Sequence, residues 1–226
     1  MKLDKLYSLR TSFTVVGLTG RTGSGCTKVA ELLSGSFEKL DNEGLRSIED
    51  FDKKTTFYKK YKIAYQFVAK DNWSQFDIIR YKDVLIFYII NKLDENYSIQ
   101  LFKFLDGFKF NDSKKLINQI DEVITNHKKI VDKISQFEKF KDLKEKEKLN
   151  TLNEIFFGDE FKAISKKISD ILCNDDYYKR TRLLHHVACN IRYTGNPFQN
   201  EGGSVDHIYS IAYLINRIIK ARKQYN

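Results

Sequence analysis

The chain has 226 residues, of which 42% are hydrophobic and 14% aromatic, so it is long and apolar enough to enclose a hydrophobic core. Its 39 basic and 30 acidic residues give a formal net charge of +9, which favours anionic partners such as nucleotides, nucleic acid or an acidic protein surface. Three widely spaced cysteines argue against a disulfide framework, and every apolar run is too short to span a bilayer. We therefore expect a cytoplasmic protein with no membrane partner.

The N-terminal part of the chain contains the most informative pattern. Residues 20–27 read GRTGSGCT and come one residue after the apolar run FTVVGL. A phosphate-binding loop, or P-loop, reads glycine, four residues, glycine, lysine and then serine or threonine. Gly20, Gly25 and Thr27 fit this pattern, whereas Cys26 stands where the lysine belongs.

Such a loop binds anions through its backbone. Glycine takes positive φ at no steric cost, so consecutive N–H groups converge, and a following helix adds its N-terminal N–H groups and positive dipole end. We predict a strand over residues 12–17 and a helix over residues 26–33. The hydroxyl of Thr27 is expected to bind Mg²⁺ between the phosphates. The predicted nucleotide-binding loop comprises Gly20, Arg21, Thr22, Gly23, Ser24, Gly25, Cys26 and Thr27.

The cysteine removes the ammonium group that normally neutralises the phosphates. Lys28 follows one residue late, which on a helix turns its side chain by about 100°. Arg21, inside the loop, is one alternative source of positive charge. Arg192, near the end of a predicted helix, is another, although a cation there also simply complements the helix dipole.

Beyond the loop, apolar residues at intervals of three and four predict a chain dominated by helices, in agreement with its single proline, Pro197. Short strands are expected at residues 37–40 and 76–79. Gly195 is expected to end the helix before Pro197, and Ser204 to cap the last helix. The predicted helices cover residues 51–70, 81–93, 111–140, 143–157, 161–173, 175–193 and 205–224.

Several other chemistries find no support in the pattern. His185 and His186 are adjacent, hence about 100° apart on a helix, and do not easily share a metal ion. The chain lacks the His-x-Glu and Pro-Cys-x-x-Cys set of zinc deaminases, and it offers no evident Ser-His-Asp or Cys-His constellation. Between residues 101 and 150, 12 lysines and 9 acidic residues indicate a solvated helix surface. Nucleic-acid binding is therefore not expected.

Three segments resemble a known family. They read GLTGRTGSGCT, FDIIRYKDVL, and HHVACNIRYTGNPF followed by a helix ending LINRIIKARK. They are similar to the N-terminal P-loop domain of bacterial two-domain antiphage deoxycytidylate deaminases, over residues 13–33, 76–92 and 183–220. In that family a nucleotide-kinase-like domain precedes a zinc-dependent deaminase domain, and deoxycytidine nucleotides are depleted during phage infection. The cysteine in the loop looks like a variant of that family.

The pattern and the resemblance together predict an α/β fold: a helix-rich P-loop NTPase or nucleotide-kinase-like core with an α-helical insertion. We expect a single domain over residues 1–226, with residues 94–176 forming the helical insertion or lid. The C-terminal deaminase domain of the family is expected to be absent from this chain, and none of its residues is carried over.

The expected function is a nucleotide-binding module that acts in sensing or regulation. Its expected cofactor is Mg²⁺ together with a nucleoside triphosphate or a deoxynucleotide. A nucleoside monophosphate kinase and an interaction domain with a vestigial P-loop are the two alternatives, so enzymatic activity is left open. A deaminase domain, a partner subunit or a second copy of the chain are the protein partners that this interpretation allows.

Overall fold

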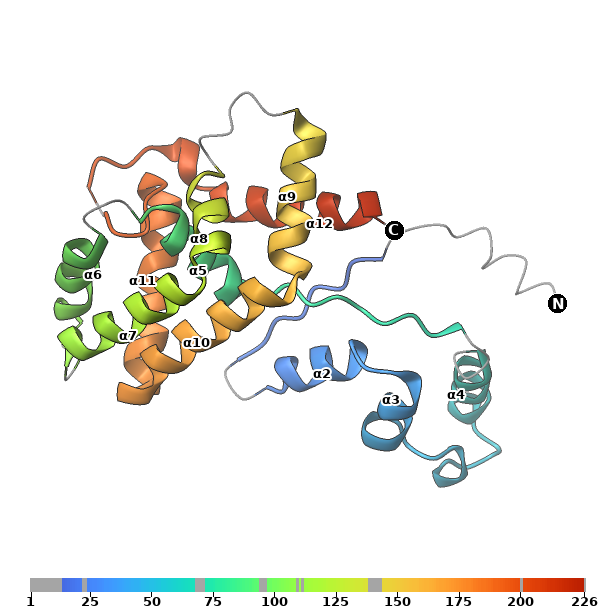
Figure 1. The fold of residues 1–226 in the computed structure, drawn as a ribbon. Coiled ribbons are helices and arrows are strands. Elements are labelled where there is room, and N and C mark those ends of the chain that lie inside the picture. The colour runs from blue at the N-terminus through green and yellow to red at the C-terminus, as the bar shows by residue number, and fades with distance from the viewer. Residues whose placement is uncertain are drawn as a thin grey trace. The chain divides into compact units, whose positions relative to one another are not determined.

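The computed structural model shows a chain of helices (Figure 1) that divides into two compact units, residues 1–78 and 79–226. The residues that it describes are 14–21, 24–67, 72–93, 97–108, 110, 112–137, 144–199 and 201–225.

The predicted α/β P-loop core is wrong. The described residues contain helices and turns but neither a strand nor a sheet. Residues 14–20, which include most of the first predicted strand, run as exposed irregular chain, and residues 76–79 are also irregular. A strand is stable only when its backbone groups pair with a neighbour, and no described segment offers these two apolar runs such a ladder.

The first unit contains three α-helices and a short 3₁₀ turn among its described residues. Residues 37–40, predicted as a strand, begin a helix because Ser36 accepts a hydrogen bond from the backbone N–H of Lys39 at 3.3 Å. The helix predicted over residues 26–33 is confirmed. These elements are α2 (Cys26–Leu33), α3 (Phe37–Gly44), the 3₁₀ turn (Ile48–Asp50) and α4 (Thr56–Phe67).

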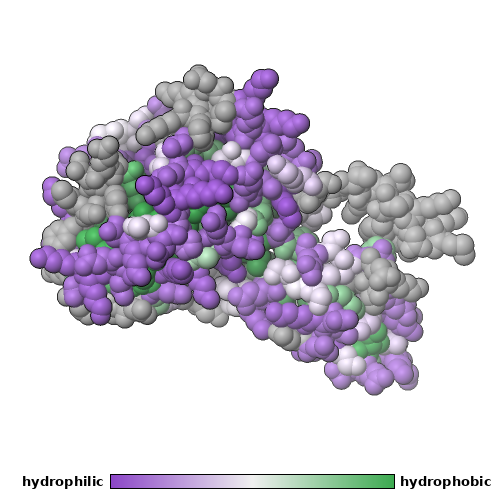
Figure 2. Space-filling view, viewed as in Figure 1, coloured by the Kyte–Doolittle hydropathy of each residue, from purple (hydrophilic) through white to green (hydrophobic). Residues whose placement is uncertain are grey.

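Aromatic contacts and hydrogen bonds join the described segments of the first unit. The Tyr61 ring lies 4.7 Å from that of Phe51, and the Tyr61 hydroxyl donates to the carbonyl of Arg46 at 2.7 Å. The indole of Trp73 donates to the carbonyl of Gly35 at 2.9 Å. None of the residues described in this unit is fully buried, and Figure 2 shows hydrophobic residues at its surface.

The second unit is an all-helical domain. The helix predicted over residues 111–140 is two helices, which break at His127, and the predicted insertion contributes several helices to the same hydrophobic core as its flanks. Helix α6 was not anticipated from the sequence. The elements are α5 (Tyr81–Asn91), α6 (Tyr97–Asp106), α7 (Ser113–Asn126), α8 (Lys128–Ser135), α9 (Glu145–Phe157), α10 (Asp159–Asp175), α11 (Tyr177–Thr194), a 3₁₀ turn (Val205–His207) and α12 (Ser210–Tyr225).

Helix α5 is the centre of this unit. Every residue from Val84 to Ile90 is buried, so the helix has no solvent-facing side there. It packs against α8, α10, α11 and α12, while hydrophilic residues cover most of the visible face of the unit (Figure 2). The buried amide of Asn91 donates to the carbonyl of Ile134 at 2.7 Å. The predicted helix over residues 81–93 is thus confirmed to within two residues.

The turn that joins α11 to the following segment is built from polar contacts. Gly195 ends α11 in the left-handed conformation at φ 75°, as predicted. The buried amide of Asn190 donates to the carbonyl of Pro197 at 2.9 Å. Ser204 accepts from the backbone N–H of Asp206 and caps the 3₁₀ turn.

None of the described helices is long and apolar enough to cross a membrane.

Candidate functional site

The loop before α2 curls back on itself. Ser24 donates its backbone N–H to the carbonyl of Arg21 at 3.0 Å, and Ser24 Oγ lies 3.3 Å from Cys26 Sγ. At Gly20 a Cβ would overlap Ser24 Oγ and lie 3.1 Å from Cys26 Sγ. The close approach of these side chains therefore requires glycine at position 20. Two further predicted loop residues, Thr22 and Gly23, lie outside the described residues.

The start of α2 is suited to an anion. Gly25, its N-cap, has φ 83° and supplies no side chain, and the first turn carries no acidic residue. By contrast, α3 begins with a capping serine and carries Glu38 in its first turn. The N-terminal N–H groups of α2 and the positive end of its dipole are therefore not compensated by a side chain of their own cap or first turn. Thr27 is exposed in this first turn, and Cys26 is half-buried.

Within the described residues, the loop lacks the support that it has in a P-loop NTPase. There, a buried parallel strand leads into the loop and helices cover the sheet. Here every residue from 14 to 20 is exposed to solvent. The structure thus keeps the loop-to-helix step of the pattern, with positive φ at Gly25, and not the sheet that normally carries it.

Arg192 is placed on α11 in the second unit, whereas the loop belongs to the first. Its guanidinium donates to the carbonyl of Ala188 at 3.3 Å and to Cys189 Sγ at 3.5 Å. A joint site of Arg192 with the loop stays a prediction.

Arg192 belongs to a cluster that sequence reasoning missed. His185 Nδ1 lies 3.9 Å from Cys189 Sγ, so His185, Cys189 and Arg192 follow one stripe of α11 at intervals of four and three. Burial raises the pKa of Tyr81, at the start of α5; the positive charge of Arg192 opposes this rise and Cys189 adds to it. The spacing His-x-x-x-Cys-x-x-Arg was the available signal, because it places the three side chains on one helix face.

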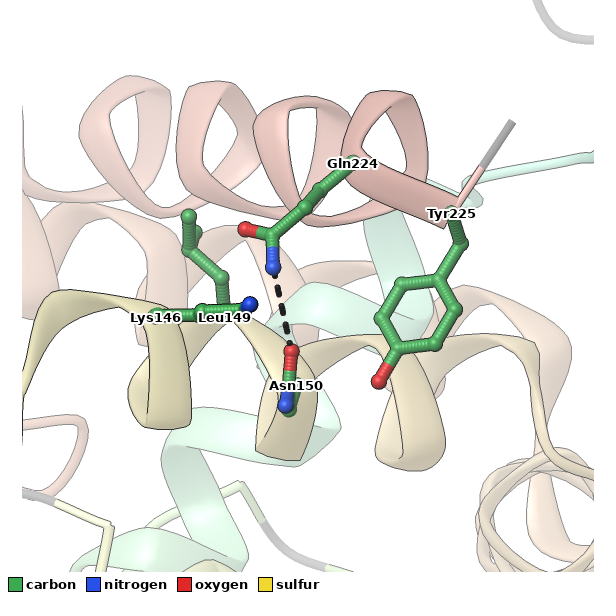
Figure 3. A pocket seen from close by; sticks show the side chains of 5 residues that line it. All are labelled: Lys146, Leu149, Asn150, Gln224 and Tyr225. Carbon is green, nitrogen blue, oxygen red and sulfur yellow. Dashed lines mark hydrogen bonds between the residues drawn. The ribbon is translucent and has the colours of Figure 1, made fainter.

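A shallow pocket of about 570 Å³ lies between α9 and α12 (Figure 3). In it, Gln224 Nε2 donates to Asn150 Oδ1 at 3.3 Å. Its lining residues are Lys146, Leu149, Asn150, Gln224 and Tyr225, and they include no carboxylate, thiol or imidazole. Binding pockets usually enclose most of a ligand and direct several polar groups toward it. This pocket is large enough for a small ligand, but it is open to solvent and lacks the side chains that would bind one specifically.

In the described part of the chain, no group of three His, Cys, Asp or Glu side chains lies close enough together to hold a metal ion. Compared with models of known families, with curated proteins and with solved structures, the chain matches none. The case for a function therefore depends on the loop and on the local chemistry of the two units.

Proposed function

We propose that residues 20–27 bind the phosphate groups of a nucleotide and that the protein is a nucleotide-responsive sensing or regulatory module. The observation that carries this proposal is the start of α2, where Gly25 adopts positive φ and neither a capping side chain nor an acidic first-turn residue is present. An anion at this point is stabilised by the helix N–H groups and dipole. The spacing of Gly20, Gly25 and Thr27 adds the phosphate-loop pattern.

The residues present fit a nucleotide bound with Mg²⁺. Mg²⁺ usually keeps several waters and takes only one or two protein ligands beside phosphate oxygens. The exposed hydroxyl of Thr27 would be such a ligand. The exposed guanidinium of Arg21 is on the same loop and replaces part of the charge that Cys26 does not supply.

Nucleotide binding would act on a unit in which no described residue is fully buried. A ligand that binds only the folded state adds to the stability of that state by mass action. A ligand at 100 times its Kd contributes about 2.7 kcal/mol. The module would respond by a shift of population, since a ligand moves an equilibrium only through its different affinities for the two states.

Thr27→Ala is expected to weaken Mg²⁺–nucleotide binding about tenfold, equivalent to about 1.4 kcal/mol, because the hydroxyl ligand of the metal is lost. Isothermal titration with Mg²⁺–ATP and with the four deoxynucleoside triphosphates measures this change. Thr56→Ala, at the exposed start of α4, is the matched control and should leave the Kd within about twofold. Equal affinities of the two variants would contradict the role of Thr27, and a chain that binds none of these nucleotides has a vestigial loop.

Cys26→Lys is expected to tighten triphosphate binding by roughly tenfold or more, since a charge-assisted hydrogen bond is worth about 1.5–3 kcal/mol. The gain should be smaller for a monophosphate, which carries fewer oxygens for the new ammonium to reach. The same titrations test it. Unchanged or weaker triphosphate binding would show that the loop does not hold phosphates in the geometry of a P-loop. A radiolabelled ATP assay on nucleoside monophosphates separates a binding module, which gives no product, from a kinase.

A further inference from the structure

Three helices of the second unit bring two cations to one buried hydroxyl. Ser169, on α10, is 1% exposed. Lys82 Nζ, from the first turn of α5, lies 3.4 Å from Ser169 Oγ, and Arg180 Nη1, from the first turn of α11, lies 3.3 Å from the same atom. The positive groups therefore converge from segments that are far apart in the sequence.

No carboxylate neutralises this pair within the described residues. Neither Lys82 nor Arg180 forms an ion pair there. Asp83, next to Lys82 in the sequence, accepts a hydrogen bond from Ser165, and Asp176 caps the backbone N–H of Tyr178. A serine hydroxyl accepts hydrogen bonds but supplies no negative charge, so within the described residues no ion pair offsets the two like charges at Ser169.

The guanidinium of Arg180 is held in place and is incompletely satisfied. The ring of Tyr177 lies 4.5 Å from Arg180 Cζ, which fixes the plane of the guanidinium. Arg180 Nε is buried and has no hydrogen-bond partner among the described residues. Since buried polar groups are nearly always hydrogen-bonded, an unpaired guanidinium N–H points to an acceptor that the described residues do not provide.

We infer that Lys82, Ser169 and Arg180 form a binding site for a small phosphate-type oxyanion, such as inorganic phosphate or a phosphomonoester. The planar guanidinium provides N–H donors in a fork that matches two oxygens, and the lysine provides a point charge. The serine hydroxyl can rotate to donate to a third oxygen. Lys82 and Arg180 are only half-buried, so an anion can reach them from solvent, while Ser169 closes the floor of the site. All three residues belong to the second unit, whereas the loop of the proposed function belongs to the first.

Titration of the full chain with inorganic phosphate tests the site, at constant ionic strength set with sodium chloride. Lys82→Gln and Arg180→Gln are each expected to weaken phosphate binding at least about tenfold, because each removes a charged donor. Arg182→Gln is the matched control: it removes the same charge from the same helix, at an exposed arginine that lies over the ring of Tyr178. It should change the Kd by less than about twofold.

A second readout identifies the contact atom and is measured on the wild-type chain. In the wild-type chain, the ¹⁵Nε–¹H resonance of Arg180, assigned with Arg180→Lys, should shift on phosphate addition and saturate with the calorimetric Kd. Phosphate that leaves this resonance unmoved, or binds Lys82→Gln as tightly as wild type, overturns the inference. Thr27→Ala should keep the Arg180 shift while losing nucleotide affinity, so failure here and failure of the loop proposal are distinguishable.

Discussion

Replacing Phe87 by alanine is expected to lower the free energy of unfolding of the second unit by about 3–5 kcal/mol, the usual range for removing a buried ring. Phe87 is 2% exposed at the centre of α5. Its ring centroid lies 5.7 Å from that of Phe137, 5.3 Å from that of Phe156 and 6.3 Å from that of Phe161. Alanine would leave a cavity between three other rings. Each of these rings is held by its own helix or turn, so they cannot move together to fill it.

Urea denaturation followed by far-UV circular dichroism measures this loss. Tyr209→Ala is the control, because it removes a ring of similar size that is 74% exposed, and it should change stability by less than about 0.5 kcal/mol. Phe87→Leu should fall between the two. A loss below about 1 kcal/mol for Phe87→Ala would mean that α5 is not enclosed as described.

Gly195→Ala is expected to destabilise the second unit by about 2 kcal/mol or more. The residue has φ 75°, a conformation that costs an L-residue roughly 1–2 kcal/mol. In addition, a Cβ there would lie 2.7 Å from Nδ1 of His207, so the imidazole must move away from the turn. The backbone term and the steric term should therefore add.

Gly202 separates these two terms. It has the same φ of 75°, but a Cβ there would meet no atom within 4 Å. Gly202→Ala should consequently show only the backbone term, and the thermal midpoint should fall further for Gly195→Ala. Adding His207→Ala should recover part of the loss in Gly195→Ala and none of that in Gly202→Ala. Equal losses at the two glycines would rule out the contact with His207.

Where local chemistry decides the structure, the sequence predicted it well. Helix α2 and the end of α11 at Gly195 were recognisable from glycine positions, and α5 from an apolar run without breakers. The periodicity of residues 111–140 also predicted helical structure correctly, although no feature of the sequence indicated the break at His127. For α2 and for the end of α11 the deciding contacts lie within a few residues of one another.

The fold prediction was wrong because it was inferred from a short pattern and a family resemblance rather than from periodicity. An apolar run of six residues before a glycine-rich loop is compatible with a strand, yet a strand exists only if distant segments pair with it. The exposed chain at residues 14–20 shows that such pairing is absent there. Similarly, residues 37–40 followed the capping preference of Ser36 rather than their own apolar content.

The anion site of the second unit could not be predicted from the sequence. Lys82 and Ser169 are 87 residues apart, and only the packing of α5 and α11 on α10 brings Lys82 and Arg180 to the same hydroxyl. The stripe of His185, Cys189 and Arg192 was different, because its spacing alone places the side chains on one face of a helix.

The burial of α5 on all sides has a consequence for biosynthesis. During translation, the seven consecutive apolar residues from Val84 to Ile90 leave the ribosome before α8, α10, α11 and α12, the helices that enclose them. Until the last of these helices is made, this apolar segment of the nascent chain cannot be fully covered by its native contacts. Until then, the growing polypeptide exposes apolar surface of the kind that promotes aggregation.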